Sequence, residues 1–475
     1  MASSAAPFVS FPSQGGLNSE APLSFLQPDE LAVADNIEYG LHGERRKRRG
    51  TTNYNTTGVF LVSSASNVTA LADFWRYGDT LTGAQRFVAT AGSSILRSTG
   101  GGGWTAITAS SSWGTNTSKV TNIVTGQGFA VFSNGVDDPV KWDQTTLSTL
   151  GASAPKFTSA AYHLRRLWTA GNSTAPSRVD LCAGGDITLW TGADTMPITL
   201  DEDDGDYNVG ISQTFHKRLY VFKGPNKGSI HELGGNTLAS LTHDKVFSGL
   251  PVLNHKAIIT TPNDIFWLSR MGVHSLVVTA AYGDTLSAFL SKPIQNIFEE
   301  LLALGSLDEA VGFWDPLRGH VGWFVIPSGE TTKEWALIYH YLISDSSPQG
   351  KKFWSVWKFS GGVAGYSAAV MLTPANPGIS LPRLYIGGTA DGMVYAGNQA
   401  MLNDGTAVAP SPYAARVRTG ALYMGAPLTE KQFYSLTTFY RPMSTTFSHD
   451  LTVTVDNRVL STSIIMGGGG DALTS

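Results

Sequence analysis

The stretch Phe129-Ala-Val-Phe-Ser133, followed directly by Asn134-Gly135, has the pattern of a short β-strand that ends in a tight turn. Aromatic and β-branched side chains favour strands, and Asn-Gly tolerates the positive φ angles that a two-residue hairpin requires. Ile265-Phe-Trp-Leu-Ser269 is a second run of this kind. Between about residue 55 and residue 400, such runs and Gly-containing turns alternate roughly every 8–12 residues, which is typical of all-β proteins. The sequence therefore predicts an all-β fold.

A weak internal repeat indicates how the strands are arranged. Three runs open with the same order of residue types: Arg166-Leu167-Trp168, Arg218-Leu219-Tyr220 and Arg383-Leu384-Tyr385. The segment from Ser98 to Trp104 also resembles the Asp-box hairpin of sialidase-type propellers, with Gly100 in place of the aspartate. At the ~40–50-residue period of propeller blades, about seven or eight blades would fit this part of the chain. We predict a β-propeller over residues 51–405.

The two ends of the chain differ from this middle part. Prolines interrupt residues 1–50, which we expect to form an extended N-terminal arm. Residues 406–475 are expected to form a small C-terminal β-domain and tail, because alternating strand-like runs occur at 416–422, 433–440 and 451–455. A single helix is predicted with Ser291 as its N-cap and an end at Gly305; its apolar face is formed by Ile294, Ile297, Phe298, Leu301 and Leu302.

Composition limits the classes of function. Charged residues make up 15% of the chain, against roughly 25% in soluble domains, which suits a subunit that buries surface against neighbours. The net charge of −4 argues against a broad nucleic-acid-binding face. Cys182 is the single cysteine, so no intrachain disulfide can form and folding in a reducing cytosol is expected. No signal peptide is recognisable, and no apolar run approaches the ~18 residues of a transmembrane helix, so stable membrane insertion is not expected.

Motifs for catalysis, cofactors or metals are not evident in the sequence. The acidic cluster Asp201–Asp206 does not have the spacing of an EF-hand loop, so a polar turn is a better interpretation than calcium binding. His163 and His216, which precede two of the Arg-Leu-aromatic runs, are interpreted as packing residues. Five tryptophans between Trp314 and Trp357 could stack on sugar rings, although aromatic clusters in strands are usually core. We therefore expect a non-enzymatic protein with no catalytic residue, no cofactor and no metal.

The N-terminal arm carries a resemblance to a known family. The relevant residues in the arm are Gly15-Gly16-Leu17-Asn18, Pro22, Pro28-Asp29-Glu30, Ala34-Asp35-Asn36, and Gly43 followed by Arg46-Lys47-Arg48-Arg49-Gly50. Later segments that fit the same order are Pro139 to Asp143, His163 to Trp168, Asp203 to Asp206, Leu268 to Val273, Leu290 to Ile294, and Trp354 to Trp357. Taken in this order, the segments resemble the short-tailed phage tail nozzle proteins, the tail tubular protein B-like β-propeller family.

The resemblance implies a structural virion protein of the phage tail that is assembled in the host cytoplasm. Such subunits form a homo-oligomeric ring, commonly a hexamer, below the adaptor ring of the head-to-tail connector. The ring extends the channel through which genomic DNA passes and offers surfaces to tail fibres or spikes. We expect the basic run Arg45, Arg46, Lys47, Arg48 and Arg49 to dock on a neighbouring protein. The alternative function is a virion-borne propeller that binds a glycan receptor or degrades a polysaccharide.

Overall fold

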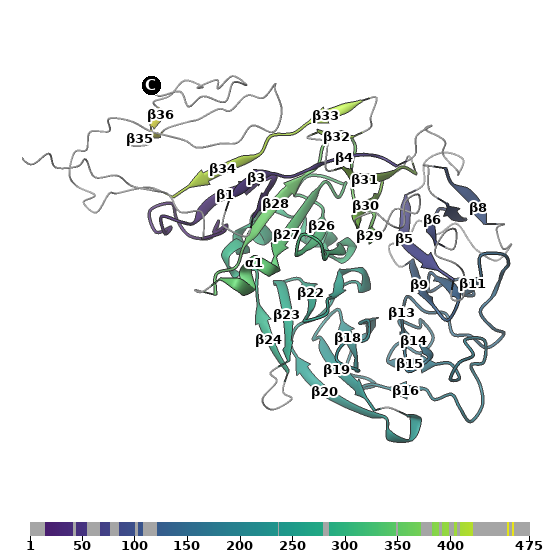
Figure 1. The fold of residues 1–475 in the computed structure, drawn as a ribbon. Coiled ribbons are helices and arrows are strands. Elements are labelled where there is room, and N and C mark those ends of the chain that lie inside the picture. The colour runs from purple at the N-terminus through teal and green to yellow at the C-terminus, as the bar shows by residue number, and fades with distance from the viewer. Residues whose placement is uncertain are drawn as a thin grey trace, which may run out of the picture. The chain divides into compact units, whose positions relative to one another are not determined.

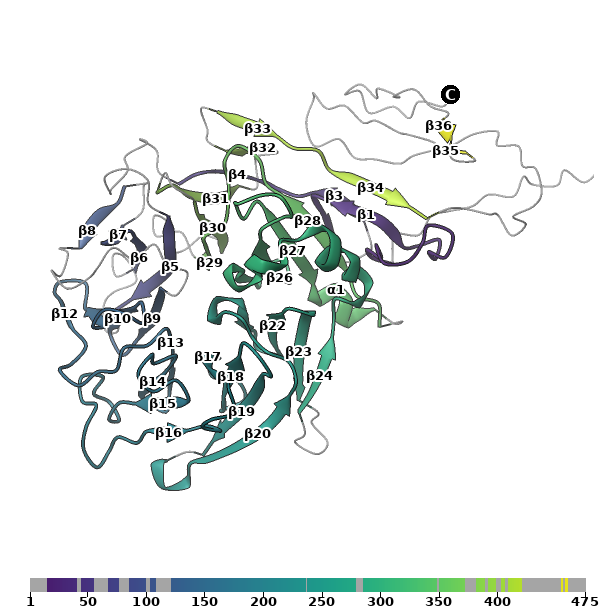
Figure 2. The same cartoon turned by 180° about the vertical axis from the view of Figure 1, so that it is seen from behind.

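The structure, a computed structural model, describes a large part of the chain and confirms the all-β prediction. The described residues are 15–40, 44–54, 67–76, 85–99, 103–107, 121–235, 237–278, 285–347, 350–371, 382–388, 392–398, 403–405, 409–420, 454–455 and 458–459. Contacts divide the chain into two compact units, residues 1–421 and residues 422–475. The first unit is a β-propeller of seven blades (Figures 1 and 2).

Each of the first five blades is an antiparallel four-stranded sheet made of consecutive strands. Blade 1 contains β5 (Val68–Trp75), β6 (Gln85–Ala91), β7 (Ser94–Ser98) and β8 (Thr105–Ile107). Blade 2 contains β9 (Asn122–Gly126), β10 (Phe129–Ser133), β11 (Val140–Trp142) and β12 (Leu147–Thr149). Blade 3 contains β13 (Ser159–His163), β14 (Arg166–Ala170), β15 (Arg178–Leu181) and β16 (Ile198–Thr199). Blade 4 contains β17 (Tyr207–Ile211), β18 (Leu219–Gly224), β19 (Ser229–Gly234) and β20 (Thr242–Ser248). Blade 5 contains β21 (Ile258–Thr260), β22 (Ile265–Ser269), β23 (Gly272–Val278) and β24 (Thr285–Phe289).

Blades 6 and 7 recruit strands from the two ends of the first unit. Blade 6 contains β25 (Val311–Asp315), β26 (His320–Val325), β27 (Trp335–His340) and β28 (Trp354–Lys358), and its sheet continues into β1 (Leu31–Asp35) and β34 (Arg416–Thr419). Blade 7 contains β29 (Ser367–Met371), β30 (Arg383–Gly387), β31 (Val394–Asn398) and, as its outermost strand, β4 (Gly50–Asn53). Because β4 precedes blade 1 in the sequence, its pairing with β31 closes the ring.

The remaining strands form short ladders. β2 (Ile37–Tyr39) pairs with β3 (Arg45–Lys47), β32 (Asn403–Gly405) pairs with β33 (Pro410–Pro412), and β35 (Thr454–Val455) pairs with β36 (Arg458–Val459) in the second unit. The helical elements are η1 (Leu238–Ser240), η2 (His255–Ala257), η3 (Lys292–Ile294), η4 (Ile297–Leu301), η5 (Leu304–Glu309) and α1 (Tyr341–Ser346). Among the described residues, every helix is too short or too polar to cross a bilayer.

The hydrophobic core lies between the blades. Seven apolar clusters in the described part of the chain each join two neighbouring blades, as Phe74 of blade 1 and Trp142 of blade 2 do with their ring centroids 5.7 Å apart. The strand-like runs of the sequence are therefore apolar on both faces, since each blade packs against one neighbour on either side. The three Arg-Leu-aromatic runs lie at the start of β14, β18 and β30, with Arg218 directly before β18; these are the second strands of blades 3, 4 and 7.

Two side chains reach across the centre of the propeller. Lys256 precedes blade 5, and its Nζ donates a 2.6 Å hydrogen bond to the carbonyl oxygen of Thr69 in blade 1. The ring of His255 bonds to the backbone of Thr121, which leads into blade 2. Blade 5 is flanked in the ring by blades 4 and 6, so contacts from it to blades 1 and 2 cross the central channel. The axis of the propeller is therefore occupied by its own side chains at this level.

The predicted boundaries of the arm and the C-terminal domain need correction. β34 was expected in a separate domain that begins at residue 406, but it pairs with β1, from Leu31↔Thr419 to Asp35↔Arg416. The predicted arm likewise belongs to the first unit, because β1 extends blade 6 and β4, which begins at Gly50, completes blade 7. The division therefore falls at residues 421 and 422. The predicted run at 433–440 lies outside the described residues.

The predicted helix after Ser291 is present but is shorter and irregular. It starts as the 3-10 turn η3 and continues into the π-helix η4, and extended backbone at Leu302 ends it before Gly305. Ser291 does not cap it, because its Oγ accepts a hydrogen bond from the backbone N–H of Val273 instead (2.9 Å). Leu301, expected on the buried face, is exposed.

Candidate functional site

The described part of the arm lies on blades 5 and 6. Its first residues fold back on β1: the N–H of Gly15 donates to Asp29 O (3.0 Å), and the N–H of Leu31 donates to Gly16 O (2.8 Å). A Cβ at Gly15 would lie 2.6 Å from the backbone of Asp29, and Gly16 has a φ of +74°. The Gly15-Gly16 pair is therefore required for this close return of the chain.

The next arm residues bind the segment that precedes η4. The N–H of Ser19 donates to Pro293 O (2.9 Å), and its hydroxyl donates to Asn296 Oδ1 (2.6 Å). The N–H of Asn296 in turn donates to the carboxylate of Glu20 (2.8 Å). These bonds attach the arm to the connection between blades 5 and 6. We call the two segments that hold the arm, residues 290–296 and 354–358, the arm seat.

Asn36 joins the arm to the second segment of the seat. It has a φ of +53°, and its N–H donates to Val356 O (2.8 Å). Its Oδ1 accepts from the N–H of Lys358 (2.7 Å) and from Arg48 Nε (2.9 Å), while its Nδ2 donates to Ala414 O (2.8 Å). Asparagine tolerates this left-handed backbone better than other residues with side chains. One buried amide thus connects the arm, blade 6 and the chain that follows the propeller.

Arg48 is the most constrained residue of the basic run. Its side chain is 0% exposed and forms a two-pronged ion pair with Asp404, which is also 0% exposed, at 2.9 and 2.5 Å. Its remaining N–H groups donate to Asn36 Oδ1, Arg49 O and Lys358 O. The guanidinium carbon lies 3.8 Å from the ring centroid of Tyr413 and 4.4 Å from that of Phe359. We call Arg48, its four hydrogen-bonding partners Asp404, Asn36, Arg49 and Lys358, and the rings of Tyr413 and Phe359 the Arg48 cluster.

The predicted docking residues therefore divide into two groups. Arg48 cannot contact another protein, because its own chain encloses it, and its docking role is withdrawn. Arg45 and Lys47 are half-buried, with burial lowering the pKa of each, and the Nζ of Lys47 lies 4.2 Å above the ring of Tyr413. Arg46 is exposed at 51% and lies 3.5 Å from the carboxylate of Glu38, and Arg49 is partly exposed.

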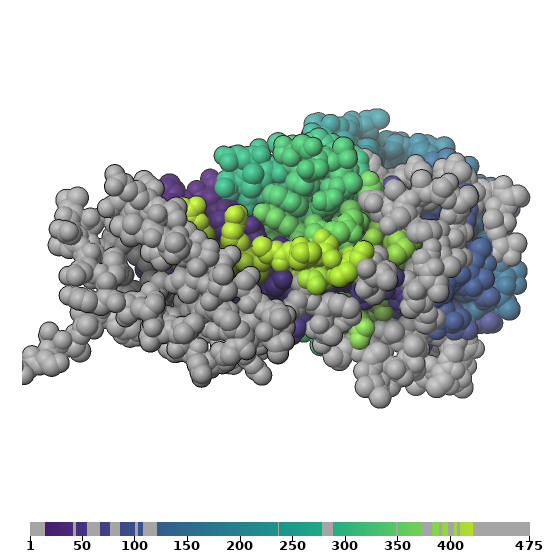
Figure 3. Space-filling view, turned by 90° about the horizontal axis from the view of Figure 1, so that it is seen from above, coloured from purple at the N-terminus to yellow at the C-terminus, as the bar shows by residue number. Residues whose placement is uncertain are grey.

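Further cations lie next to the arm on β34, which the sequence did not associate with the basic run. Arg416 has a 67% exposed side chain, 3.3 Å from Asp35 of β1, and Arg418 is also exposed. β34 is the last strand of the blade 6 sheet within the described residues. Figure 3 shows β33 and β34 as a yellow-green band on the surface. Arg46, Arg416 and Arg418 together are called the basic surface below.

A buried histidine pair lies beneath the arm hairpin β2–β3. His320 and His340 face each other across β26 and β27, with ring centroids 4.3 Å apart. Tyr39 packs edge-on against His340 at 5.0 Å, and Trp357 packs against His320 at 5.8 Å. Burial lowers the pKa of His340 to about 3 and that of His320 well below its usual value. Both rings are therefore neutral at physiological pH.

The acidic cluster Asp201–Asp206 serves internal contacts. The buried Lys223 donates from Nζ to Leu200 O (2.8 Å) and Asp201 O (2.7 Å) and pairs with Asp204 (2.8 Å). The carboxylate of Asp206 accepts three backbone N–H groups from residues 226–228 at 2.7 to 3.0 Å. Among the described residues, no group of three or more carboxylate, histidine or cysteine side chains has the geometry of a metal site. The polar-turn interpretation fits these contacts.

The tryptophans and histidines singled out from the sequence lie mainly in packing positions. Trp323, Trp354 and Trp357 are buried, and their Nε1 atoms donate to backbone carbonyls at 3.0 to 3.1 Å. Trp314 and Trp335 are partly buried beside the core. His163 is buried beside Trp168, whereas His216 lies in an exposed turn with a φ of +49°. Residues 100–102 of the Asp-box-like segment lie outside the described residues.

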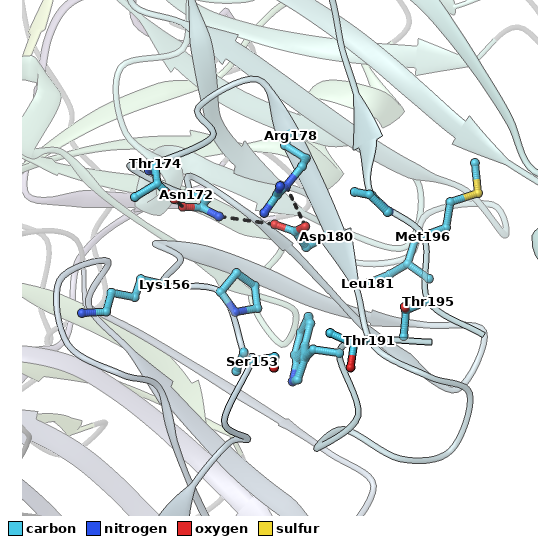
Figure 4. A pocket seen from close by; sticks show the side chains of 14 residues that line it. Ser153, Lys156, Asn172, Thr174, Arg178, Asp180, Leu181, Thr191, Thr195 and Met196 are labelled. Carbon is cyan, nitrogen blue, oxygen red and sulfur yellow. Dashed lines mark hydrogen bonds and ion pairs between the residues drawn. The ribbon is translucent and has the colours of Figure 1, made fainter. Parts of the chain in front are cut away.

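A pocket that sequence patterns did not indicate lies at the junction of blades 2 and 3 (Figure 4). Its volume is about 440 Å³, and its wall is formed by residues 153–156, by residues around β15, and by residues 190–197. Asn172 and Arg178 converge on Asp180 at its centre, at 3.4 and 2.8 Å (Figure 4). The wall as a whole comes from three separate parts of the chain, residues 153–156, 172–181 and 190–197, which explains why no local motif marks the pocket.

Comparisons with known proteins give no family assignment. No family model matches the sequence, and a search of curated proteins finds no match. Among solved structures, the chain is similar to the extracellular domain of a putative hybrid two-component system from B. thetaiotaomicron, with 9% identity and a TM-score of 0.45 over 74% of this chain. This chain covers 39% of that domain. It is also similar to Kuenenia stuttgartiensis hydrazine synthase, with 9% identity and a TM-score of 0.45, over 72% of this chain and 99% of the other. Similarity this low carries no conclusion about function.

Proposed function

We propose that this chain is a structural subunit of a short-tailed phage tail nozzle, and that it acts by assembly rather than by catalysis. The observation that carries the proposal is where the family-like segments meet. Gly15-Gly16, Asn36 and the Arg48–Gly50 segment come from the arm, and Leu290 to Ile294 and Trp354 to Trp357 come from the propeller. Gly16 bonds to Leu31 of β1, Asn36 bonds to Val356 and to Arg48, and Trp354 bonds to Leu290. Segments that resemble one family thus share one structural task.

The contacts between these segments are specific. Trp354 Nε1 donates to Leu290 O (3.1 Å), which joins the two halves of the arm seat. Trp357 Nε1 donates to Ile37 O of the arm (3.1 Å). A Cβ at Gly50 would lie 1.9 Å from Asn403 O, so the family-like glycine allows β4 to enter blade 7. This agreement favours the family resemblance over a chance order of short motifs.

The occupied centre of the propeller constrains the mechanism. Lys256 and His255 cross the axis, so genomic DNA cannot use the axis of an individual subunit. In this proposal, the DNA channel is enclosed between subunits of the ring, and the propellers form its wall. A closed propeller suits that task, because it leaves no long unpaired sheet edge around the ring of blades.

The direct test is assembly on phage heads. Purified chain is mixed with genome-free heads that carry portal and adaptor, and tail vertices are examined by negative-stain electron microscopy. We expect disc-like subunits that add a ring-shaped extension to the vertex. Discs that never associate with the vertex, at any ratio of subunit to head, would contradict the nozzle function and leave the propeller intact.

The basic surface offers a second test of the same proposal. The variant Arg416→Glu, Arg418→Glu reverses two exposed charges of the basic surface without touching the Arg48 cluster or the pair between Arg46 and the buried Glu38. We expect it to fold normally and to lose attachment to the vertex, because docking on an acidic neighbour depends on these charges. The matched control reverses two exposed charges on blades 4 and 5: Lys227→Glu and Arg270→Glu. If both variants attach equally well, the basic surface is not the docking site.

A further inference from the structure

Part of the pocket wall is a loop of blade 3 that is longer than a connection between two strands requires. In blade 2, residues 143–146 connect the third and fourth strands, and in blade 4 residues 235–241 do so. In blade 3 the same connection takes residues 182–197. Long ordered connections on a rigid scaffold are where binding sites commonly lie. The length of this loop therefore calls for an explanation other than closing a hairpin.

The loop is held in a defined conformation. Arg166 of β14 donates to the carboxylate of Asp194 (2.5 Å) and to its carbonyl oxygen (2.5 Å). The other oxygen of that carboxylate accepts the N–H of Gly184 (2.8 Å). Trp190, 9% exposed, packs into the core between blades 2 and 3. The pocket wall is thus preorganised, which lowers the entropic cost of binding a ligand.

The polar groups of the pocket are arranged for a ligand rich in hydroxyl groups. Asp180 has a 13% exposed carboxylate that can accept hydrogen bonds from hydroxyl groups. Within the described part of the chain, Arg178 uses only its Nε toward Asp180, which leaves its terminal N–H groups available as donors. The Nε1 of Trp190 is buried without a hydrogen-bond partner in the described residues. Pocket walls of this kind combine convergent donors and acceptors.

The charge and the apolar surface of the pocket narrow the class of ligand further. The charge of Arg178 is offset by Asp180, and that of Lys156 by Asp138 at 3.5 Å, so the pocket has no strong net charge. Met196, 42% exposed, and Pro197 add apolar surface at the loop. A pyranose ring presents hydroxyl groups around its edge and C–H groups on its faces, which matches this mixture. Its size is compatible with a pocket of about 440 Å³.

We propose that the pocket between blades 2 and 3 binds an uncharged saccharide unit of a glycan. The Asp180 carboxylate accepts a hydrogen bond from one sugar hydroxyl, and the Asn172 Nδ2 donates one to an adjacent hydroxyl oxygen. The terminal N–H groups of Arg178 donate to a further oxygen, and Met196 covers one face of the ring. This inference goes beyond the nozzle function and does not depend on it, since binding is a property of the single chain.

The test uses the full-length chain without phage heads. It is screened on an array of neutral hexose and N-acetylhexosamine glycans together with uronic-acid and sialic-acid glycans. Neutral glycans that bind are then titrated by saturation-transfer NMR. We expect binding of neutral glycans, and a loss of affinity of about tenfold or more in Asp180→Asn and Asn172→Ala. Asp203→Asn, which changes an exposed carboxylate outside the pocket, is expected to bind like the parent.

A surface variant keeps the test independent of folding. Met196→Glu places a carboxylate at an exposed position of the pocket wall, so it is expected to fold and to bind neutral glycans more weakly. The proposal is overturned if no neutral glycan binds at millimolar concentration, if only charged glycans bind, or if Asp180→Asn and Met196→Glu bind neutral glycans like the parent chain. Vertex assembly by these variants reports separately on the nozzle function.

Discussion

Replacing Arg48 by methionine should destabilise the first unit strongly. The substitution keeps most of the side-chain volume but removes the cation that faces Asp404, whose carboxylate is 0% exposed. A buried charge that loses its partner costs about 3–5 kcal/mol, far more than an exposed ion pair contributes. The change also removes donors to Asn36 Oδ1 and Lys358 O, two acceptors that hold the arm to blade 6.

This magnitude is a large fraction of the stability of a folded unit, which is about 5–15 kcal/mol. We expect Arg48→Met to move the urea midpoint to clearly lower concentration and to make the arm sensitive to limited proteolysis. Lys245→Met is the matched control, because it removes a lysine paired at 2.8 Å with Asp201, where both side chains are about two-fifths exposed (42% and 40%). That variant should change the free energy of unfolding by less than about 1 kcal/mol.

A double variant separates the loss of the pair from the loss of packing. Arg48→Met, Asp404→Leu removes both charges, so no uncompensated charge remains in the cluster, and we expect it to recover most of the lost stability. If Arg48→Met unfolds at the same urea concentration as Lys245→Met, the Arg48 cluster does not hold the arm. If the double variant is as unstable as the single one, the cost arises from the lost hydrogen bonds and ring contacts instead.

Three further changes test other parts of the fold. Burial lowers the pKa of His340 in the folded chain to about 3, so as the pH falls from 7.5 to 5 the unfolded chain binds a proton there and the folded chain does not. His340→Gln should therefore reduce the loss of unfolding free energy over this range by about 2 kcal/mol. Urea midpoints at pH 7.5 and pH 5 check this, and an unchanged pH dependence would contradict it. Burial also lowers the pKa of Lys256 to about 7, so between pH 7 and about 10.4 the unfolded chain binds one proton more than the folded chain, and stability rises with pH. Lys256→Met should therefore reduce the increase in melting temperature between pH 7 and pH 9. Gly50→Ala should destabilise by about 2 kcal/mol or more, because the new Cβ would lie 1.9 Å from Asn403 O, whereas Gly103→Ala, with nothing within 4 Å, should melt like the parent chain.

The sequence predicted the propeller because the relevant signals are local. Turn residues and apolar runs repeat within each blade, and the Arg-Leu-aromatic runs occupy equivalent second strands. The burial of Arg48 could not be predicted in this way. A run of five basic residues predicts side chains at the surface. Arg48 is buried instead by Asp404 and Tyr413, which lie more than 350 residues away in the sequence. The pairing of β1 with β34 is equally non-local, which is why the boundary was placed too early.

The pocket and the channel contacts escaped prediction for the same physical reason. Asn172, Arg178 and Asp180 form no motif with residues 190–197 until the loop folds over them. Lys256 has no acceptor near it in sequence, and its partner Thr69 is supplied by a blade on the other side of the ring. Periodicity reports the environment of a strand, whereas such sites depend on how blades and loops meet.

The position of the arm determines which contacts would carry a load applied through it. Between β1 and β4 the chain passes the Arg48 cluster, so a force on the arm acts on β1 and the cluster before it reaches β4. The pairing of β4 with β31 completes blade 7 and closes the ring together with the apolar cluster between blades 7 and 1, so its separation would remove one of the two contacts that close the propeller. The buried ion pair therefore isolates the closing strand from the arm. Arg48→Met should accordingly expose β4 as well as the arm to hydrogen exchange, whereas loss of the basic surface should leave the exchange of β4 unchanged.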